Sequence, residues 1–303
     1  MGDSESESES ESEIAPTHPS SPFATPDDAR RVVVALPCYN EAAAIPTVVE
    51  AWRAALPDVE LVVFDNNSTD GTGTLARSLG VTVFDVPEQG KGHVVRAIFR
   101  QFPEKDAIVL ADGDGTYPPG HALPLIALVL EGQADMAVGA RRPVEGVGAM
   151  SPIRSLGNRI IPAVFLILIG PGNTDLLSGY RVFGRRYREM VRLRSSGFEI
   201  ETELAVEAVA RGLKVVEIPV PYYPRITGTH SKLNAFRDGR RILWTIVVKG
   251  AKLRPWRLLF SMALPMGLFA WGVGSQVLLL ASATLAVAAT ALAAWAMSKA
   301  TKP

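Results

Sequence analysis

The sequence predicts an α/β fold with a mostly parallel sheet, helices on both faces of the sheet and a C-terminal transmembrane helical hairpin. Between residues 31 and 138, short apolar runs rich in β-branched residues alternate with segments of helical period. Strands that are apolar throughout are typical of parallel sheets buried on both faces. From Trp256 to Ser298 no charged side chain follows Arg257, and this stretch is long enough for two membrane-spanning helices.

The first 28 residues differ in composition from the rest of the chain. Asp3 and an alternating Ser-Glu run supply six acidic side chains, and no lysine or arginine precedes Arg30. Such a segment buries too little apolar area to offset the entropy lost on ordering, so we expect a disordered tail over residues 1–28. It lacks the basic start and apolar stretch of a signal peptide. The whole chain has 31 basic and 31 acidic residues, so the remainder is basic, which suits phosphates or an anionic membrane surface.

The elements of the predicted sheet follow one another in a regular order. The expected strands cover residues 31–36, 61–64, 81–86, 107–111 and 134–138, with helical segments between them. The first of these helices has Ile45, Val48, Val49, Trp52 and Leu56 on one face. In parallel sheets, ligands bind beyond the carboxyl ends of the strands. Three polar groups lie at such ends and predict a single site there: Pro37–Glu41, Asp65 and Asp112–Asp114.

Asp112 and Asp114 are candidate metal ligands. Two carboxylates separated by one glycine at a strand end suit a hard divalent cation, Mg²⁺ or Mn²⁺. Such an ion would neutralise a diphosphate and stabilise it as a leaving group. The same residues also occur in ordinary turns, so the prediction depends on the other polar groups at this edge. Cys38 is the single cysteine, which excludes an intrachain disulfide and a multi-cysteine metal site.

Several motifs resemble those of family 2 glycosyltransferases with the GT-A fold. Residues 36–41 (Leu-Pro-Cys-Tyr-Asn-Glu) resemble the family's opening motif, and residues 65–72 resemble its second motif. Gly90-Lys91-Gly92 and Asp112-Gly113-Asp114 follow in the family's order and approximate spacing. Residues 175–183 and 225–233 resemble the branch that transfers sugars to dolichyl or undecaprenyl phosphate. The resemblance covers roughly residues 31 to 245.

This resemblance implies a role for each matching residue. Pro37, Tyr39 and Glu41 would frame the nucleoside, and Asp65 would accept a hydrogen bond from the base. Asp112 would lie near the ribose or the metal, with Asp114 as the principal metal ligand. Arg141 would reach phosphate or sugar, and Arg225, Ser231 and Lys232 would contact the donor diphosphate or the acceptor phosphate. Asn66 and Asn67 depart from the commoner Asp-Gly pair, so no second carboxylate acts there.

Acceptor activation is expected to depend on basic residues. Transfer to a hydroxyl usually needs a carboxylate base, but a phosphate monoester is already largely a dianion at pH 7. We therefore expect Arg141, Arg225 and Lys232 to matter more than Glu201, which could support the site or simply cap and solvate a helix. Lys91, between two glycines, could bind phosphate or lie in a plain turn. The apolar run 160–169 is too short to span a membrane and fits either a buried helix or an interfacial one.

Basic residues flank the apolar C-terminal stretch on both sides. This distribution favours both ends in the cytoplasm and an even number of crossings, and so a multi-pass protein of the cell membrane with a cytoplasmic catalytic domain. A buried helical hairpin inside a soluble domain is the alternative. The expected regions are a tail (1–28), a GT-A catalytic domain (29–230), a basic juxtamembrane helical segment (231–256), two transmembrane helices (257–298) and a cytoplasmic tail (299–303).

The predicted function is an inverting, metal-dependent transfer of a hexose or N-acetylhexosamine from a nucleotide-sugar, with a UDP-sugar favoured, to polyprenyl phosphate. The expected partners are this donor, the lipid acceptor and the bilayer, with no nucleic acid and with a homo-oligomer left open. The alternatives are a GDP-mannose-dependent dolichyl-phosphate mannosyltransferase, a family 2 transferase with a non-lipid acceptor, and a non-catalytic sugar-nucleotide sensor.

Overall fold

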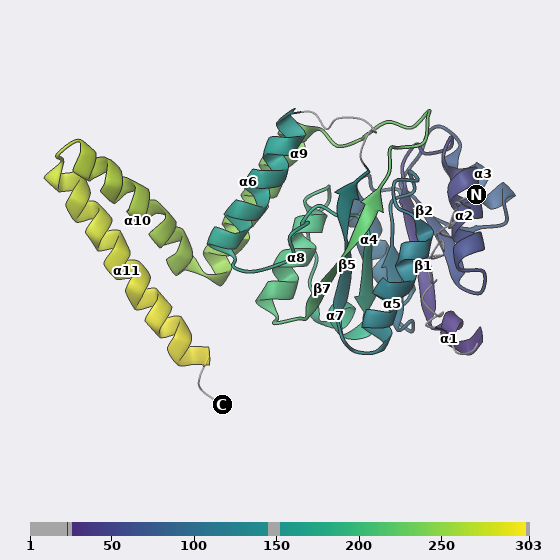
Figure 1. Ribbon diagram of the computed structural model, residues 1–303, viewed down its shortest axis with the longest axis horizontal. Helices are drawn as coiled ribbons and strands as arrows, with labels where there is room; N and C mark the ends of the chain where they lie inside the picture. Colours follow the sequence, from purple (N-terminus) through teal and green to yellow (C-terminus); the bar gives the residue numbers. More distant parts are fainter. Residues whose placement is uncertain (1–22, 24–25, 145–151, 301–303) are drawn as a thin grey trace, which may run out of the picture.

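The computed structural model describes residues 23, 26–144 and 152–300. In Figure 1 an α/β domain lies at one end, two long helices follow beside it, and a helical hairpin projects away from them. Most of the predicted disordered tail (residues 1–22 and 24–25) and the last residues of the predicted cytoplasmic tail (301–303) lie outside the described residues.

One seven-stranded sheet forms the centre of the α/β domain, in the order β3-β2-β1-β4-β6-β5-β7. The pairs of β6 with β4 and with β5 are antiparallel, and all other pairs are parallel. Five strands match expected ones, whereas β6 and β7 had no counterpart in the prediction. The strands are β1 (Val32–Cys38), β2 (Glu60–Asp65), β3 (Thr82–Asp85), β4 (Ala107–Leu110), β5 (Met136–Pro143), β6 (Arg181–Gly184) and β7 (Val215–Tyr222).

Helices cover both faces of the sheet because successive strand residues point to opposite sides. Val32, Val34 and Leu36 of β1 pack against one layer, and Val33 and Ala35 pack against the other. The first layer contains α2 (Ile45–Ala55), α3 (Thr72–Ser78) and α5 (Ala122–Leu130); the second contains α4 (Lys91–Gln101), α7 (Arg185–Met190) and α8 (Ile200–Ala210). The short α1 (Pro26–Arg30) and the 3-10 turn η1 (Pro119–His121) complete the domain.

Two further helices, α6 (Pro152–Leu168) and α9 (Ala235–Leu253), run side by side next to α8 (Figure 1). Phe165 of α6, Ala205 of α8 and Ile246 of α9 belong to one buried apolar cluster that joins the three helices. On the outside, Phe236 and Trp244 of α9 are 83% and 68% exposed. The 160–169 run is therefore helical and partly buried, and several of its apolar side chains face outward as well.

The C-terminal hairpin consists of α10 (Pro255–Gly272) and α11 (Gln276–Ala300). The two helices approach closely where Gly267 meets Ser282, whose hydroxyl donates a hydrogen bond of 3.0 Å to the Ala263 carbonyl. Within the described residues one helix, over Gln276–Ala296, is long and apolar enough to cross a membrane. The helical hairpin agrees with the prediction, whereas two membrane crossings stay a prediction. The outer surface of the hairpin is apolar, with exposed Phe269, Trp271 and Leu280.

Candidate active site

The three predicted polar groups follow strands β1, β2 and β4, which are neighbours in the sheet. A cavity of about 440 Å³, here called the edge pocket, opens at this edge. Its walls include Pro37, Tyr39, Glu41, Asp112, Asp114, Arg225 and Lys232, together with Lys91 and residues 196–198. Asp65 does not line this pocket, although Asn66 does.

The turn after β1 is fixed by the segment that resembles the family's second motif. Asn40 adopts a left-handed conformation (φ 54°), and its Oδ1 accepts a 2.7 Å hydrogen bond from the Thr69 amide. The Asn40 and Glu41 amides donate to Ser68 Oγ and Thr72 Oγ1, each at 2.9 Å. The hydroxyl groups of Ser68 and Thr72 therefore hold the backbone that places Glu41 on the wall of the edge pocket.

Asp65 and Asn66 hold neighbouring loops. Asp65 Oδ1 accepts a 3.3 Å hydrogen bond from the Ser68 amide, and its other oxygen lies where a side chain at Gly73 would collide. The Asn66 amide group donates to the Val86 and Glu88 carbonyls, at 3.1 and 2.8 Å, while Asn66 Oδ1 accepts from the Gly90 amide at 2.7 Å. A carboxylate could not donate to two carbonyls, which accounts for the asparagine at this position.

The Asp112-Gly113-Asp114 turn places two carboxylates at the floor of the edge pocket. Gly113 is required because a Cβ would collide with Cys38 Sγ. Asp114 Oδ1 accepts hydrogen bonds from the amide and hydroxyl of Thr116, at 3.0 and 2.7 Å. Asp114 Oδ2 lies 2.7 Å from an Arg225 guanidinium nitrogen as an ion pair, without a well-aligned hydrogen bond.

Burial and neighbouring charges separate the pKa values of the site carboxyl groups. Burial alone would raise the pKa of Asp112, but the Lys91 ammonium outweighs it and holds that pKa below the usual range. The pKa of Asp114 is raised by burial and by the charge of Asp112. Burial, reinforced by Asp114 and opposed by Arg225, raises the pKa of Glu41 to about 7. Protons and cations therefore compete for Glu41 near neutral pH.

The oxygens of this site fit a hard divalent cation. Glu41 Oε2 and Asp114 Oδ2 are buried without a hydrogen-bond partner among the described residues, and buried polar atoms are normally satisfied. The described part of the chain contains no group of three or more His, Cys, Asp or Glu side chains arranged to hold a metal. Mg²⁺ commonly takes one or two carboxylates together with substrate phosphates and water. Asp114, with Asp112 or Glu41 on the same pocket wall, therefore suits such an ion when a diphosphate is present.

Lys91 is a site residue to which sequence reasoning assigned no firm role. Its ammonium lies 2.6 Å from Asp112 Oδ1 and 2.5 Å from Glu201 Oε1. Glu201 is buried in α8, so it neither caps nor solvates the helix. Burial raises the pKa of Glu201, and the Lys91 charge opposes that shift. The glycines on both sides of Lys91 were the available signal, because they indicate close backbone approach at the start of α4.

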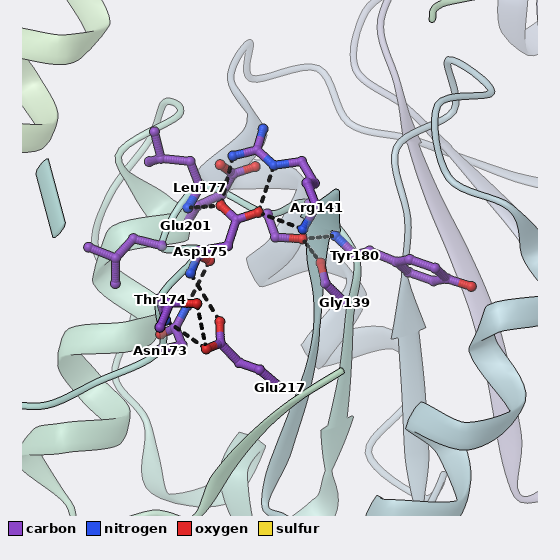
Figure 2. A network of polar contacts seen from close by, with 12 residues as sticks. Gly139, Arg141, Asn173, Thr174, Asp175, Leu177, Tyr180, Glu201 and Glu217 are labelled. Carbon is purple, nitrogen blue, oxygen red and sulfur yellow. Dashed lines mark hydrogen bonds and ion pairs between the residues drawn. The ribbon is translucent and has the colours of Figure 1, made fainter. Parts of the chain in front are cut away.

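Arg141, near the end of β5, is held by Asp175 (Figure 2). Its Nε and Nη2 lie 2.8 and 2.7 Å from the two Asp175 oxygens, and its amide donates to Asp175 Oδ2 at 3.0 Å. Glu217 of β7 in turn accepts from the amides of Thr174 and Asp175, at 2.7 and 3.0 Å. The guanidinium carbon also lies 5.5 Å from the Tyr222 ring centroid.

The segment between β7 and α9 brings the remaining predicted residues to the site. Arg225 bridges Asp114 and Glu41, and its Nη1 lies 3.3 Å from Glu41 Oε1. Lys232 donates a 3.1 Å hydrogen bond from Nζ to the Asn40 carbonyl and lines the edge pocket. Ser231 lies instead on a second cavity.

The second cavity, here called the helix cavity, has a volume of about 710 Å³ and shares Lys91, Asp112 and Arg225 with the edge pocket. One part of its wall is charged, with four cations (Lys91, Arg141, Arg225 and Arg240) and two carboxylates (Asp112 and Glu201). Much of the rest comes from α6 and α9 and is mostly apolar, including Ile160, Ile161, Phe236, Leu243, Trp244 and Val247.

Comparisons with known proteins identify the family of the chain. A family model described as Glycosyl transferase family 2 matches residues 33–187. Glycosyltransferase AglJ of Haloferax volcanii is 38% identical over 215 residues, which cover 71% of this chain and 69% of the relative. Polyprenol monophosphomannose synthase of Mycolicibacterium smegmatis is 31% identical over 218 residues, which cover 68% of this chain and 82% of the relative.

A solved structure confirms the predicted fold class. Glucosyl-3-phosphoglycerate synthase from Mycobacterium tuberculosis, crystallised with Mn²⁺ and uridine-diphosphate-glucose, superimposes with a TM-score of 0.59 at 20% identity. The match covers 76% of this chain and 84% of that one. At this level of identity the likeness concerns the fold, a mixed but mostly parallel sheet enclosed by helices.

Proposed function

The chain belongs to glycosyl transferase family 2, and from that premise we propose that it transfers a sugar from a nucleotide-sugar to polyprenyl phosphate. The proposed donor is a UDP-hexose or a UDP-N-acetylhexosamine. The reaction inverts the anomeric configuration, and its products are a β-linked polyprenyl-phospho-sugar and the free nucleoside diphosphate.

The edge pocket supports the donor half of this proposal. Pro37, Tyr39 and Glu41 lie on its wall, where they would frame the nucleoside. Asp112 and Asp114 lie on its floor, and they would hold Mg²⁺ or Mn²⁺ against the diphosphate. A divalent ion bound there would neutralise charge on the departing diphosphate. Asp65 lies outside the pocket wall and would act on the nucleoside side by holding the loop at Ser68.

The helix cavity supports the acceptor half of this proposal. It has a charged part, which includes Arg141 and which adjoins the edge pocket at Lys91 and Arg225, and apolar walls on α6 and α9. A phosphate on a long apolar chain matches both parts: the cations attract the phosphate and the apolar walls cover the chain. A small soluble acceptor would leave the apolar walls facing water. This junction of cationic and apolar surface is the observation on which the lipid acceptor depends.

The acceptor phosphate would be aligned with the anomeric carbon by four residues: Arg141, Arg225, Ser231 and Lys232. The phosphate oxygen attacks that carbon on the face opposite the diphosphate, the new carbon–oxygen bond forms, and the old bond breaks with its electron pair on the diphosphate. Because a phosphate monoester is largely a dianion at pH 7, the residues contribute by positioning and charge neutralisation rather than by removing a proton.

The membrane arrangement follows from the C-terminal helices. We propose that α10 and α11 both cross the membrane, with the basic residues on either side of the hairpin in the cytoplasm. The apolar outer surface of the hairpin supports this topology, since a water-exposed surface with so many large apolar side chains would be unfavourable. The catalytic domain would then face the cytoplasm, and α6 and α9 would lie at the membrane surface.

A GDP-mannose donor is the second candidate, favoured by the name of the mannose-transferring relative. Purified full-length protein in lipid nanodiscs can be incubated with labelled UDP-glucose, UDP-N-acetylglucosamine or GDP-mannose and with undecaprenyl or dolichyl phosphate, with and without Mn²⁺. We expect a labelled lipid from a UDP-sugar only when the metal is present. A labelled lipid from GDP-mannose alone would correct the donor. Binding of nucleotide-sugars without any turnover would refute the transferase proposal and favour a sensor.

A further inference from the structure

Both carboxylates of the helix cavity are bound to a single ammonium group. Asp112 and Glu201 are the acidic side chains on its wall, and Lys91 Nζ lies 2.6 Å from one and 2.5 Å from the other. The Lys91 and Glu201 side chains are only 8% and 6% exposed. The described part of this wall therefore offers an acceptor four cations and no carboxylate without a cationic partner.

The position of Lys91 is set by the backbone around it. Side chains at Gly90 and Gly92 would collide with the carbonyls of Ser196 and Ser195, and the Gly92 amide donates a 2.9 Å hydrogen bond to the Ser196 carbonyl. The start of α4 is thus packed directly on the loop that leads into α8 and Glu201. This contact explains the two glycines and holds the ammonium between the edge pocket and the helix cavity, since Lys91 lines both.

The pairing matters because Glu201 is the carboxylate placed for proton transfer. It lines the helix cavity together with Arg141, and both are drawn in Figure 2. A hydroxyl acceptor must lose a proton as it attacks, and a nearby carboxylate commonly takes that proton. Asp112 lies at the donor side, where a bound diphosphate would occupy it. An ammonium hydrogen-bonded to Glu201 weakens that carboxylate as a base, because a proton added there would lie beside an existing positive charge.

We propose that Lys91 is a specificity-determining residue that keeps Glu201 paired, so that the site transfers sugar only to an acceptor that is already anionic. This inference rests on the proposed function and names the chemical class of its acceptor: phosphate monoesters are used, and alcohols and water are not. Lys91 acts through Glu201 and is in this sense a positioning residue.

Removal of the ammonium should permit a second reaction. With Lys91→Met, Glu201 faces the cavity without its cation. A water oxygen can then bond to the anomeric carbon while its proton passes to Glu201. The bond from that carbon to the diphosphate breaks, the electron pair leaves on the diphosphate, and the products are free sugar and nucleoside diphosphate. A polyprenol hydroxyl can react in the same way and would yield a polyprenyl glycoside.

The test compares native protein with Lys91→Met, Lys91→Arg, Glu201→Gln and the double variant Lys91→Met/Glu201→Gln. Each is given the labelled nucleotide-sugar that the native protein uses, with undecaprenyl phosphate, undecaprenol or no acceptor. The readout is the ratio of free sugar and polyprenyl glycoside to polyprenyl-phospho-sugar. A loss of packing alone would lower all products together and leave this ratio unchanged.

We expect the ratio to rise at least tenfold in Lys91→Met, to stay near the native value in Lys91→Arg, and to return to it in the double variant. An unchanged ratio in Lys91→Met, or a raised ratio that persists in the double variant, overturns the inference. If native protein makes no polyprenyl-phospho-sugar from any donor, the proposed function itself fails. Native transfer with an unaltered ratio in the variants refutes only the role of Lys91.

Glu201→Gln provides an independent measurement should Lys91→Met fail to fold. Glutamine keeps the shape of the side chain and can still accept a hydrogen bond from Lys91. Removal of a working general base lowers rates by about 10² to 10⁴. We therefore expect transfer to undecaprenyl phosphate to fall by less than about tenfold in Glu201→Gln. A fall greater than about a hundredfold would mean that Glu201 acts as the base, and the inference would be wrong.

Discussion

Asp175→Asn should separate the positioning of Arg141 from its charge. In the native chain Asp175 accepts three hydrogen bonds from Arg141, at 2.7 to 3.0 Å, and the two side chains are 17% and 22% exposed. Arg141 outweighs the effect of burial and lowers the pKa of Asp175, so this carboxyl group is charged at neutral pH. Asparagine has nearly the same shape but only one acceptor oxygen, and its amide nitrogen would face the guanidinium.

The geometry of this ion pair sets the expected losses in stability and in kcat/KM. Removal of one partner from a fully buried ion pair costs about 3 to 5 kcal/mol. Partial exposure reduces this cost, and so do the two hydrogen bonds, from the Arg141 amide and Nε, that the asparagine oxygen can still accept in the place of Asp175 Oδ2. We therefore expect a loss of about 2 kcal/mol in the free energy of unfolding. Arg141 would keep its charge but lose its fixed orientation. A misplaced catalytic group can cost about a hundredfold in rate, so we expect kcat/KM to fall by about 10- to 100-fold.

Both quantities can be measured on the same preparations, by urea unfolding and by transfer to undecaprenyl phosphate. Asp135→Asn is the matched control, because Asp135 also pairs with an arginine, at 2.8 Å, but Arg186 is 61% exposed and lies outside both cavities. We expect Asp135→Asn to retain native kcat/KM. Native kcat/KM in a folded Asp175→Asn variant, together with a large loss in Arg141→Met, would refute the positioning role of Asp175.

Three further predictions concern the metal, pH and the membrane. Asp114→Asn should abolish metal-dependent turnover and weaken Mn²⁺ binding measured by calorimetry without unfolding the domain; near-native activity would refute the metal assignment. Because the pKa of Glu41 is raised to about 7 in the folded state from an ordinary value of 4.5, its contribution to stability is complete below about pH 4.5 and lost as the pH rises through 7. Relative to Glu41→Gln, metal-free native protein should therefore lose about 3 kcal/mol of unfolding free energy over that interval, and parallel pH profiles of the two proteins would contradict the burial argument. A chain ending after Arg254 should leave the membrane fraction and lose activity on long-chain acceptors; if it still sediments with vesicles, the exposed side chains of α6 and α9 also bind membrane.

The strands and helices around the site could be predicted closely from local patterns. The apolar run 31–36 became β1 (Val32–Cys38), and the expected face of the following helix became the buried face of α2. These elements are predictable because a strand buried on both faces and a helix buried on one each leave a characteristic period in the sequence. The motif residues also lie at strand ends, as predicted. This could be expected because the fold class determines the order of the strands in the sheet.

The short strand β6 could not be found in the same way. It has four residues, Arg181–Gly184, and its antiparallel position between β4 and β5 depends on pairing with strands far away in the sequence. Arg181 is fully buried within it and donates to the carbonyls of Leu176 and Ser178, at 2.7 and 2.9 Å. Asp175, six residues before Arg181, accepts hydrogen bonds from Arg141 on β5.

By itself, the sequence determined the fold class, the membership of a glycosyltransferase family and the apolar character of the C-terminal hairpin. Each of these is recorded in local pattern: period, motif order or composition. Only the tertiary structure decided which charges meet. Lys91 and Glu201 are 110 residues apart, and Arg225 and Glu41 are 184 apart. Such pairs are set by how the helices and loops pack on the sheet, because side chains distant in sequence interact only where the folded backbone brings them within a few ångströms of each other.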